Sequence, residues 1–121
     1  MRSVDTGRLG ENVAAGLLRK QGYKILEQNV RSRLGELDIV AQQRQVICFV
    51  EVKTAVLDSA IFPEENVTLA KQRKLIRLAQ SWLHRRGQEE QPIRFDVVSV
   101  GLGPKGQVIR TRLIQNAFDG V

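Results

Sequence analysis

The chain has 121 residues, a net charge of +6 and a single cysteine, and 42% of its residues are hydrophobic. This length suits one domain, large enough to bury roughly two thirds of its unfolded surface in one core. One cysteine excludes an intramolecular disulfide and a Cys-rich zinc site, and we interpret Cys48 as a packed core thiol. Charged residues interrupt the first twenty positions, and no apolar run approaches the roughly 18 residues of a membrane span. We therefore expect a cytoplasmic protein that makes no contact with a membrane.

The excess of positive charge lies in one segment. Six of the 19 Lys and Arg residues, and none of the 13 Asp and Glu residues, fall between Asn66 and Arg86, so the rest of the chain is electrically balanced. A local positive surface binds polyanions because neutralised phosphates release their counterions. The alternative is a solvated helix face that keeps the protein soluble.

The first predicted element is an amphipathic helix from about Gly7 to Gln21. Apolar residues recur there every four positions, Asp5 or Thr6 is the expected N-cap, and Gly22 follows the end. The residues from Tyr23 to Val30 then predict a first strand.

Residues 35–53, GELDIVAQQRQVICFVEVK, predict two more strands around a polar turn. Asp38, Glu51 and Lys53 interrupt these apolar segments, although such side chains resist burial unless they have partners or a function. Both faces of the third strand begin apolar, which predicts an interior strand covered on both sides. Its expected faces are Val46, Cys48, Val50 and Val52 on one side, and Ile47, Phe49, Glu51 and Lys53 on the other.

The segment from Thr68 to Arg86 predicts a second amphipathic helix, with one apolar side that includes Trp82 as a core residue. Two strands, from Ile93 to Val100 and from Gln107 to Ile114, follow around the turn sequence GLGPKG. The order αβββαββ predicts an α/β fold: a single domain with a central mixed β-sheet flanked by helices.

The position of Asp38 relative to Glu51 depends on the turn between the second and third strands. If the connection through residues 42–45 has an even number of loop residues, Asp38 lies opposite Glu51 or one diagonal step away. An odd number puts the two on opposite faces, and Gln-Gln-Arg-Gln lacks the signals of a tight hairpin, so both registers stay open. Within the second strand, Glu36, Asp38 and Val40 are expected on one face, and Leu37, Ile39 and Ala41 on the other.

Two adjacent carboxylates repel each other unless a cation lies between them. A hard divalent ion suits oxygen ligands, Mg²⁺ above all, with Mn²⁺ as the alternative. A bound metal lowers the pKa of its water and offsets charge on a phosphoryl oxygen, while Lys53 orients the nucleophile or faces the anionic transition state. This is the outline of a site for phosphodiester hydrolysis. An ordinary ion pair of Lys53 with Glu51 or Asp38 is the alternative.

The order of several motifs resembles the PD-(D/E)xK nuclease superfamily: Glu11 in the first helix, GELD ending at Asp38, EVK from Glu51 to Lys53, and then a basic helix. More narrowly, GRLGENVAAGLLRKQGY, GELDIVA, FVEVK, KQRKL and RFDVV make the whole chain similar to the small bacterial YraN-type family, related to Holliday-junction resolvases. The resemblance implies one nuclease-like domain over residues 1–121 with a restriction-endonuclease-like core. It also implies catalytic Asp38, Glu51 and Lys53, and metal ligands Glu11, Asp38 and Glu51.

These observations together predict a Mg²⁺-dependent endonuclease that hydrolyses DNA, with branched DNA among its candidate substrates. Cutting a junction at two symmetric positions would ordinarily need a homodimer. One alternative is a nucleic-acid-binding protein that keeps the nuclease-like fold without efficient catalysis, and another is a structural protein whose charged edge is an ion-pair cluster. The expected DNA contacts on the basic helix are Lys71, Arg73, Lys74 and Arg77.

Overall fold

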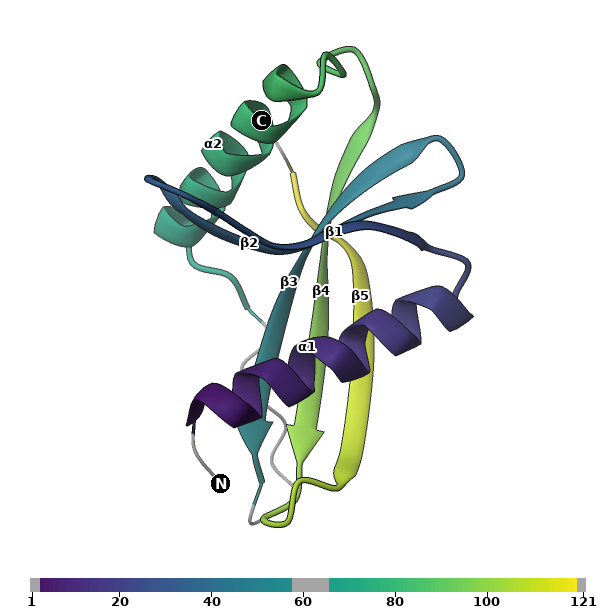
Figure 1. The fold of residues 1–121 in the computed structure, drawn as a ribbon, viewed down its shortest axis with the longest axis vertical. Helices are drawn as coiled ribbons and strands as arrows, with labels where there is room; N and C mark the ends of the chain where they lie inside the picture. Colours follow the sequence, from purple (N-terminus) through teal and green to yellow (C-terminus); the bar gives the residue numbers. More distant parts are fainter. Residues whose placement is uncertain (1–2, 58–65, 120–121) are drawn as a thin grey trace.

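The structure is a computed structural model that describes residues 3–57 and 66–119, with side chains from Thr6 onward (Figure 1). No helix in these residues is long and apolar enough to cross a membrane. The described elements follow the predicted order αβββαββ. They are α1 (Ser3–Lys20), β1 (Lys24–Ser32), β2 (Gly35–Gln43), β3 (Val46–Val56), α2 (Leu69–Arg85), β4 (Ile93–Leu102) and β5 (Val108–Phe118).

The strands form one five-stranded mixed sheet in the order β1-β2-β3-β4-β5. Only β3 and β4 pair in parallel, because the crossover through α2 returns the chain in the same direction, and the other neighbours are antiparallel. Figure 1 shows α1 crossing one face of the sheet. The other helix, α2, lies apart from α1 and beside the β1-β2 hairpin. The predicted α/β architecture is confirmed and is consistent with a restriction-endonuclease-like core.

The middle strand, β3, separates two hydrophobic cores. Cys48 and Val50 pack with the apolar side of α1, whereas Ile47 and Phe49 pack with the apolar side of α2. The predicted alternation and the interior position of this strand are therefore confirmed. Cys48 is fully buried, and burial raises the pKa of its thiol to about 11, as suits a core residue.

Trp82 of α2 packs against the sheet. Its ring is 2% exposed and meets Phe49 edge to face, with 5.9 Å between the ring centroids. The indole Nε1 donates a hydrogen bond to the Glu27 carboxylate of β1 at 3.1 Å. Trp82 is thus a core residue, as predicted.

The strand β2 pairs with β3 over only part of its length. The paired residues end at Ile39 and Val50, and beyond that point β2 continues with β1 alone. A two-stranded ribbon twists more than a wide sheet, and this ribbon turns Leu37 toward the α2 core although Ile39 faces the α1 core. The prediction that Leu37 and Ile39 share a face is therefore wrong. A fork opens between β2 and β3 at Asp38.

The helix α1 begins earlier than predicted. It starts at Ser3, so Asp5 and Thr6 lie inside the helix and neither is its N-cap. The apolar repeat marks only the part of the helix that covers the sheet, and for this reason it underestimates the length. The end is close to the prediction, because α1 stops at Lys20 and Gly22 has a φ of 88°.

A buried polar network fixes the far end of α1 to β4 and β5. Asp96 is 1% exposed, and its carboxylate accepts hydrogen bonds from the Tyr23 hydroxyl at 2.7 Å, Arg94 Nε at 2.8 Å and the Asn116 backbone N–H at 2.9 Å. Asn116 has a φ of 51° at a break in the β4-β5 register. The strand β5 continues past this break to Phe118, beyond its predicted end.

Near its beginning, α1 comes unusually close to β3. Gly10 is buried, and a Cβ atom there would lie 1.9 Å from Thr54 Oγ1. Only glycine permits this approach. The next residue is Glu11, so the contact sets the position of that side chain at the fork.

We predict that Gly10→Ala destabilises the protein by about 1 to 3 kcal/mol, because the added methyl group forces the helix away from β3. Urea unfolding measures the change. Gly16→Ala in the same helix is the matched control, since a Cβ there would meet nothing within 4 Å. That control should gain roughly 0.5 to 1 kcal/mol from helix propensity. Equal stabilities for the two variants would contradict the close contact.

Candidate metal centre

The turn between β2 and β3 has an even number of residues. Arg44 and Gln45 form a two-residue turn, and Arg44 adopts a φ of 57°, in the left-handed region. Arginine seldom adopts this conformation, so residue types gave no sign of the turn. The even register predicted from sequence is therefore the one observed, with Ile39 opposite Val50, and the side chains of Asp38 and Glu51 come within hydrogen-bond distance just beyond this pair.

Asp38 lies at the fork and bridges the strands that separate there. Its Oδ2 accepts the backbone N–H of Val52 in β3 at 2.9 Å, and its carboxyl group also shares a hydrogen bond with Glu51. Burial raises the pKa of Asp38. Burial, followed by the negative charge of Asp38, raises the pKa of Glu51 to about 7. Burial and the neighbouring carboxylate thus favour the protonated form of Glu51 more than in water.

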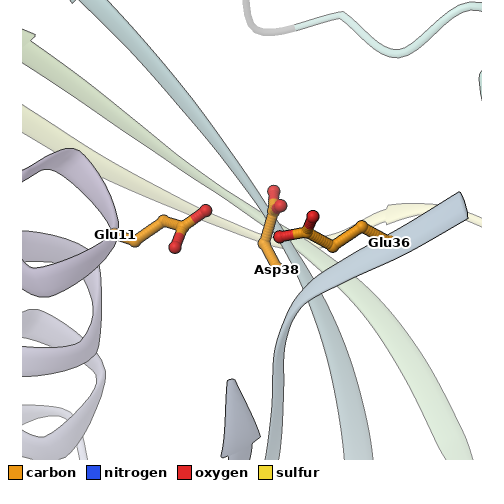
Figure 2. A group of neighbouring side chains, drawn as sticks. All are labelled: Glu11, Glu36 and Asp38. Carbon is orange, nitrogen blue, oxygen red and sulfur yellow. The ribbon is translucent and has the colours of Figure 1, made fainter. Parts of the chain in front are cut away.

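Glu11 and Glu36 complete an acidic cluster around Asp38. Figure 2 shows Glu11 reaching from α1 and Glu36 from β2, with Asp38 between them. One carboxylate oxygen of each residue lies within 4.8 Å of the other two. Burial and then the Asp38 charge raise the pKa of Glu11, against the opposing effect of a hydrogen bond with the Asn29 side chain. The cluster therefore concentrates negative charge that the protein alone does not fully offset.

This donor set fits a hard divalent cation. The ligand atoms are carboxylate oxygens, which Mg²⁺, Mn²⁺ and Ca²⁺ prefer. Bonds of about 2.0 to 2.1 Å place the oxygens around Mg²⁺ roughly 3 to 4 Å apart, so small side-chain shifts would bring the three groups to one ion. Arg31 Nε lies 3.5 Å from Glu36 Oε2, but both side chains are exposed and such a pair is weak.

Two lysines lie near the carboxylates in different ways. Lys53 Nζ donates to the backbone carbonyl of Asn66 at 2.9 Å. Lys71 Nζ in α2 lies 3.8 Å from Glu51 Oε1. The alternative considered from the sequence was an ion pair of Lys53 with Glu51 or Asp38. Among the described residues no such pair forms, and the lysine that pairs with Glu51 is Lys71.

The structure brings together most of the residues singled out from the sequence and adds one. Glu11, Asp38 and Glu51 meet at the fork, although Glu51 lies on the α2 side of Asp38 and outside the cluster of three. Glu36 was missed, and the signal that could have found it is its spacing of two residues from Asp38 in the same strand. Of the four predicted DNA contacts, Lys71 reaches the site, whereas Arg73, Lys74 and Arg77 lie on the exposed side of α2.

Residues 10–100 match the uncharacterised protein family UPF0102. The chain belongs to this family. UPF0102 is the YraN family, so the resemblance drawn from the sequence motifs is confirmed. The UPF0102 protein STH1475 of Symbiobacterium thermophilum is 53% identical over 93% of this chain and 94% of its own length. A UPF0102 protein of Caldicellulosiruptor saccharolyticus is 42% identical over 98% of this chain and all of its own length.

Among solved structures, SfsA of Pyrococcus furiosus in complex with Ca²⁺ aligns with a TM-score of 0.39 and 17% identity. The alignment covers 88% of this chain and 60% of SfsA. The UPF0102 membership rests on sequence, and the chemistry of the site rests on its own geometry.

Without divalent metal, the free energy of unfolding should fall as the pH rises from about 5 to about 7. Glu51 binds its proton more tightly in the folded state than in the unfolded one, so stability is lost as the pH rises from the unfolded toward the folded pKa. The expected loss is on the order of 2 kcal/mol.

Urea unfolding in EDTA across this pH range measures the loss. Glu51→Gln should flatten most of the decline, because the amide cannot ionise. Glu90→Gln, at an exposed acid away from the fork, is the control and should retain the wild-type slope. A profile that Glu51→Gln leaves unchanged would contradict the raised pKa of Glu51.

Proposed function

We propose that this protein is a metal-dependent endonuclease that hydrolyses DNA phosphodiester bonds, using Mg²⁺ with Mn²⁺ as an alternative. The observation that carries the proposal is the convergence of Glu11, Glu36 and Asp38 at the fork, with Glu51 hydrogen-bonded to Asp38. Carboxylates gathered in this way oppose folding, and proteins retain such a cost at functional sites.

In this proposal Glu11, Asp38 and Glu51 are the metal ligands, and Glu36 adds a fourth carboxylate. When bound, the metal would lower the pKa of a water molecule and offset negative charge on the phosphate. Asp38 is central because it lies between Glu11 and Glu36 and also shares a hydrogen bond with Glu51. The hydrogen bond from Val52 fixes the Asp38 carboxylate before any metal arrives.

The reaction is hydrolysis. A water molecule adds to phosphorus, one P–O ester bond breaks, and the products are a phosphate monoester and a hydroxyl group. Asp38 and Glu51 are proposed to orient the attacking water and accept its proton, and Lys53 to orient the nucleophile or face the anionic transition state. Lys53 lies on the same strand face as Glu51, two residues further along β3.

The proposed DNA contacts are Lys71 and the exposed basic residues of α2. Arg73, Lys74 and Arg77 are exposed on α2, and the Lys74 side chain lies beside Gly35 at the start of β2. The three residues lie between Asn66 and Arg86, where six Lys and Arg residues occur and no Asp or Glu. Branched DNA and a homodimer belong to this proposal through the family's relation to junction resolvases.

A second candidate is a DNA-binding protein with a nuclease-like fold and no efficient catalysis. One observation favours it: Lys53 Nζ is engaged by the carbonyl of Asn66 instead of facing the carboxylates. Salt-dependent DNA binding without Mg²⁺-dependent cutting would support this candidate over the nuclease.

Asp38→Asn tests the metal site before any substrate is known. Asparagine can still accept the Val52 hydrogen bond but has no charge, so stability in EDTA should stay equal or rise by about 0.5 to 2 kcal/mol. Millimolar-range Mg²⁺ should stabilise wild type, by about 2.7 kcal/mol at 100 times Kd, and leave the variant unchanged.

Thermal unfolding with EDTA and with Mg²⁺ measures both effects, and a cleavage assay on single-stranded, duplex and four-way-junction DNA accompanies it. Glu90→Gln should respond to Mg²⁺ as wild type does. A wild type indifferent to Mg²⁺ would refute the metal site. Mg²⁺ stabilisation without cutting of any DNA would favour the second candidate.

Replacing Arg73, Lys74 and Arg77 together by Gln should flatten the slope of log Kd against log salt concentration by roughly 2.7 units, about 0.9 for each lost phosphate contact. Fluorescence anisotropy with labelled DNA across a salt series measures the slope. The matched control replaces three exposed basic residues at the end of α1 and the start of β1, Arg19, Lys20 and Lys24, by Gln. Equal slopes for the two triple variants would show that the basic face of α2 is a solvated surface and not a DNA contact.

A further inference from the structure

Lys71 reaches the acidic centre from the first turn of α2. Thr68 caps this helix, and its hydroxyl accepts the backbone N–H of Lys71 at 3.2 Å, which fixes where the helix begins. The Lys71 side chain is 43% exposed, whereas that of Glu51, 3.8 Å away, is 13% exposed. An ammonium group therefore lies against a mostly buried carboxyl group and still has access to solvent.

A lysine is unfavourable at this point of a helix. The first turn carries the positive end of the helix dipole, and the third helical residue after a Thr cap is most often Glu or Gln. The first turn of α2 contains no acidic residue and has Lys71 in that third position. Helix stability thus does not account for this lysine, whereas its contact with Glu51 does.

The lysine of the EVK motif occupies a different place. Lys53 Nζ is bound to the Asn66 carbonyl, at the chain segment that leads into α2. The positive charge of Lys71 acts on both carboxyl groups of the Asp38 and Glu51 pair, and on Glu51 it acts more strongly than that of Lys53. Lys71 is accordingly the ammonium group best placed to serve the centre.

We propose that Lys71 is a catalytic residue of this site and not merely a contact to the DNA backbone. In the metal-free protein its ammonium compensates Glu51. With the carboxylates engaged by Mg²⁺, the same flexible and half-exposed side chain binds a non-bridging oxygen of the scissile phosphate and offsets the charge that develops there. This role rests on the proposed nuclease function.

The role predicts effects of opposite sign for Lys71→Met. Removing an ammonium that competes with the metal for Glu51 should tighten Mg²⁺ binding about tenfold, because like charges no longer share the site. Removing the same group from the transition state should lower kcat about 100-fold with little change in KM. Loss of a merely structural residue would weaken both metal binding and catalysis.

Titration calorimetry with Mg²⁺ and steady-state cleavage of a four-way DNA junction measure the two effects on the full chain. Arg73→Met is the matched control, because it removes one exposed positive charge from the same helix turn. It should raise KM and leave both Mg²⁺ affinity and kcat unchanged. Lys71→Arg restores the charge and should recover part of the wild-type kcat.

Tighter Mg²⁺ binding and lower kcat in Lys71→Met, with partial recovery in Lys71→Arg, would support the assignment. If wild type binds Mg²⁺ and cuts DNA but Lys71→Met behaves like Arg73→Met, the assignment of Lys71 is overturned and the nuclease function stands. If wild type binds no Mg²⁺ or cuts no DNA, the proposed function itself is overturned.

Discussion

The hydrogen bond from the Val52 backbone to the Asp38 carboxylate is the interaction on which the site depends. Where β2 leaves β3, the edge of β3 loses its partner, and a buried N–H group without an acceptor is costly. Asp38 supplies the missing acceptor from its side chain at 2.9 Å. The same carboxylate that we assign to metal binding therefore closes the sheet at the fork. This double role explains how a charged group can stay in one orientation between two apolar strands.

The charges around this bond are arranged so that none of the acidic groups is isolated. Glu51 has a hydrogen bond with Asp38 and faces Lys71, and Glu11 has a hydrogen bond with Asn29. These contacts lower the repulsion at the fork but leave the pKa values of Glu11, Asp38 and Glu51 raised, so the metal-free fold keeps an electrostatic cost. A site that is compensated only in part can accept a cation, which a fully satisfied ion-pair network would not do as readily.

Periodicity in the sequence was sufficient for the order of the elements, the interior position of β3 and the core roles of Cys48 and Trp82. It failed where a single residue decides the geometry. The left-handed φ of Arg44, which determines the register of Asp38, has no signature in residue type. The twist that turns Leu37 to the other face follows from the loss of the β3 partner.

The two lysines could not be distinguished from sequence either. The EVK motif placed Lys53 at the centre, yet its Nζ binds the Asn66 carbonyl. Lys71 reaches Glu51 because Thr68 sets the first residue of α2, and a shift of that cap by one residue would rotate the side chain away by about 100°. Contacts of this kind, between elements distant in the sequence, do not change the hydrophobic periodicity and so cannot be predicted from it.

The two attachments of α1 make this helix a spacer of fixed length. Near its start it touches β3 through Gly10, and just past its end Tyr23 is bound to the buried Asp96. Glu11 stands at a set distance and angle from both points. One residue inserted between Glu11 and Tyr23 would turn Gly10 and Glu11 about 100° around the helix axis relative to Tyr23. Glu11 would then point away from Asp38 although no residue had been substituted. In this part of the protein, the number of residues carries information that residue identity does not, and relatives should vary in α1 by substitution far more readily than by insertion or deletion.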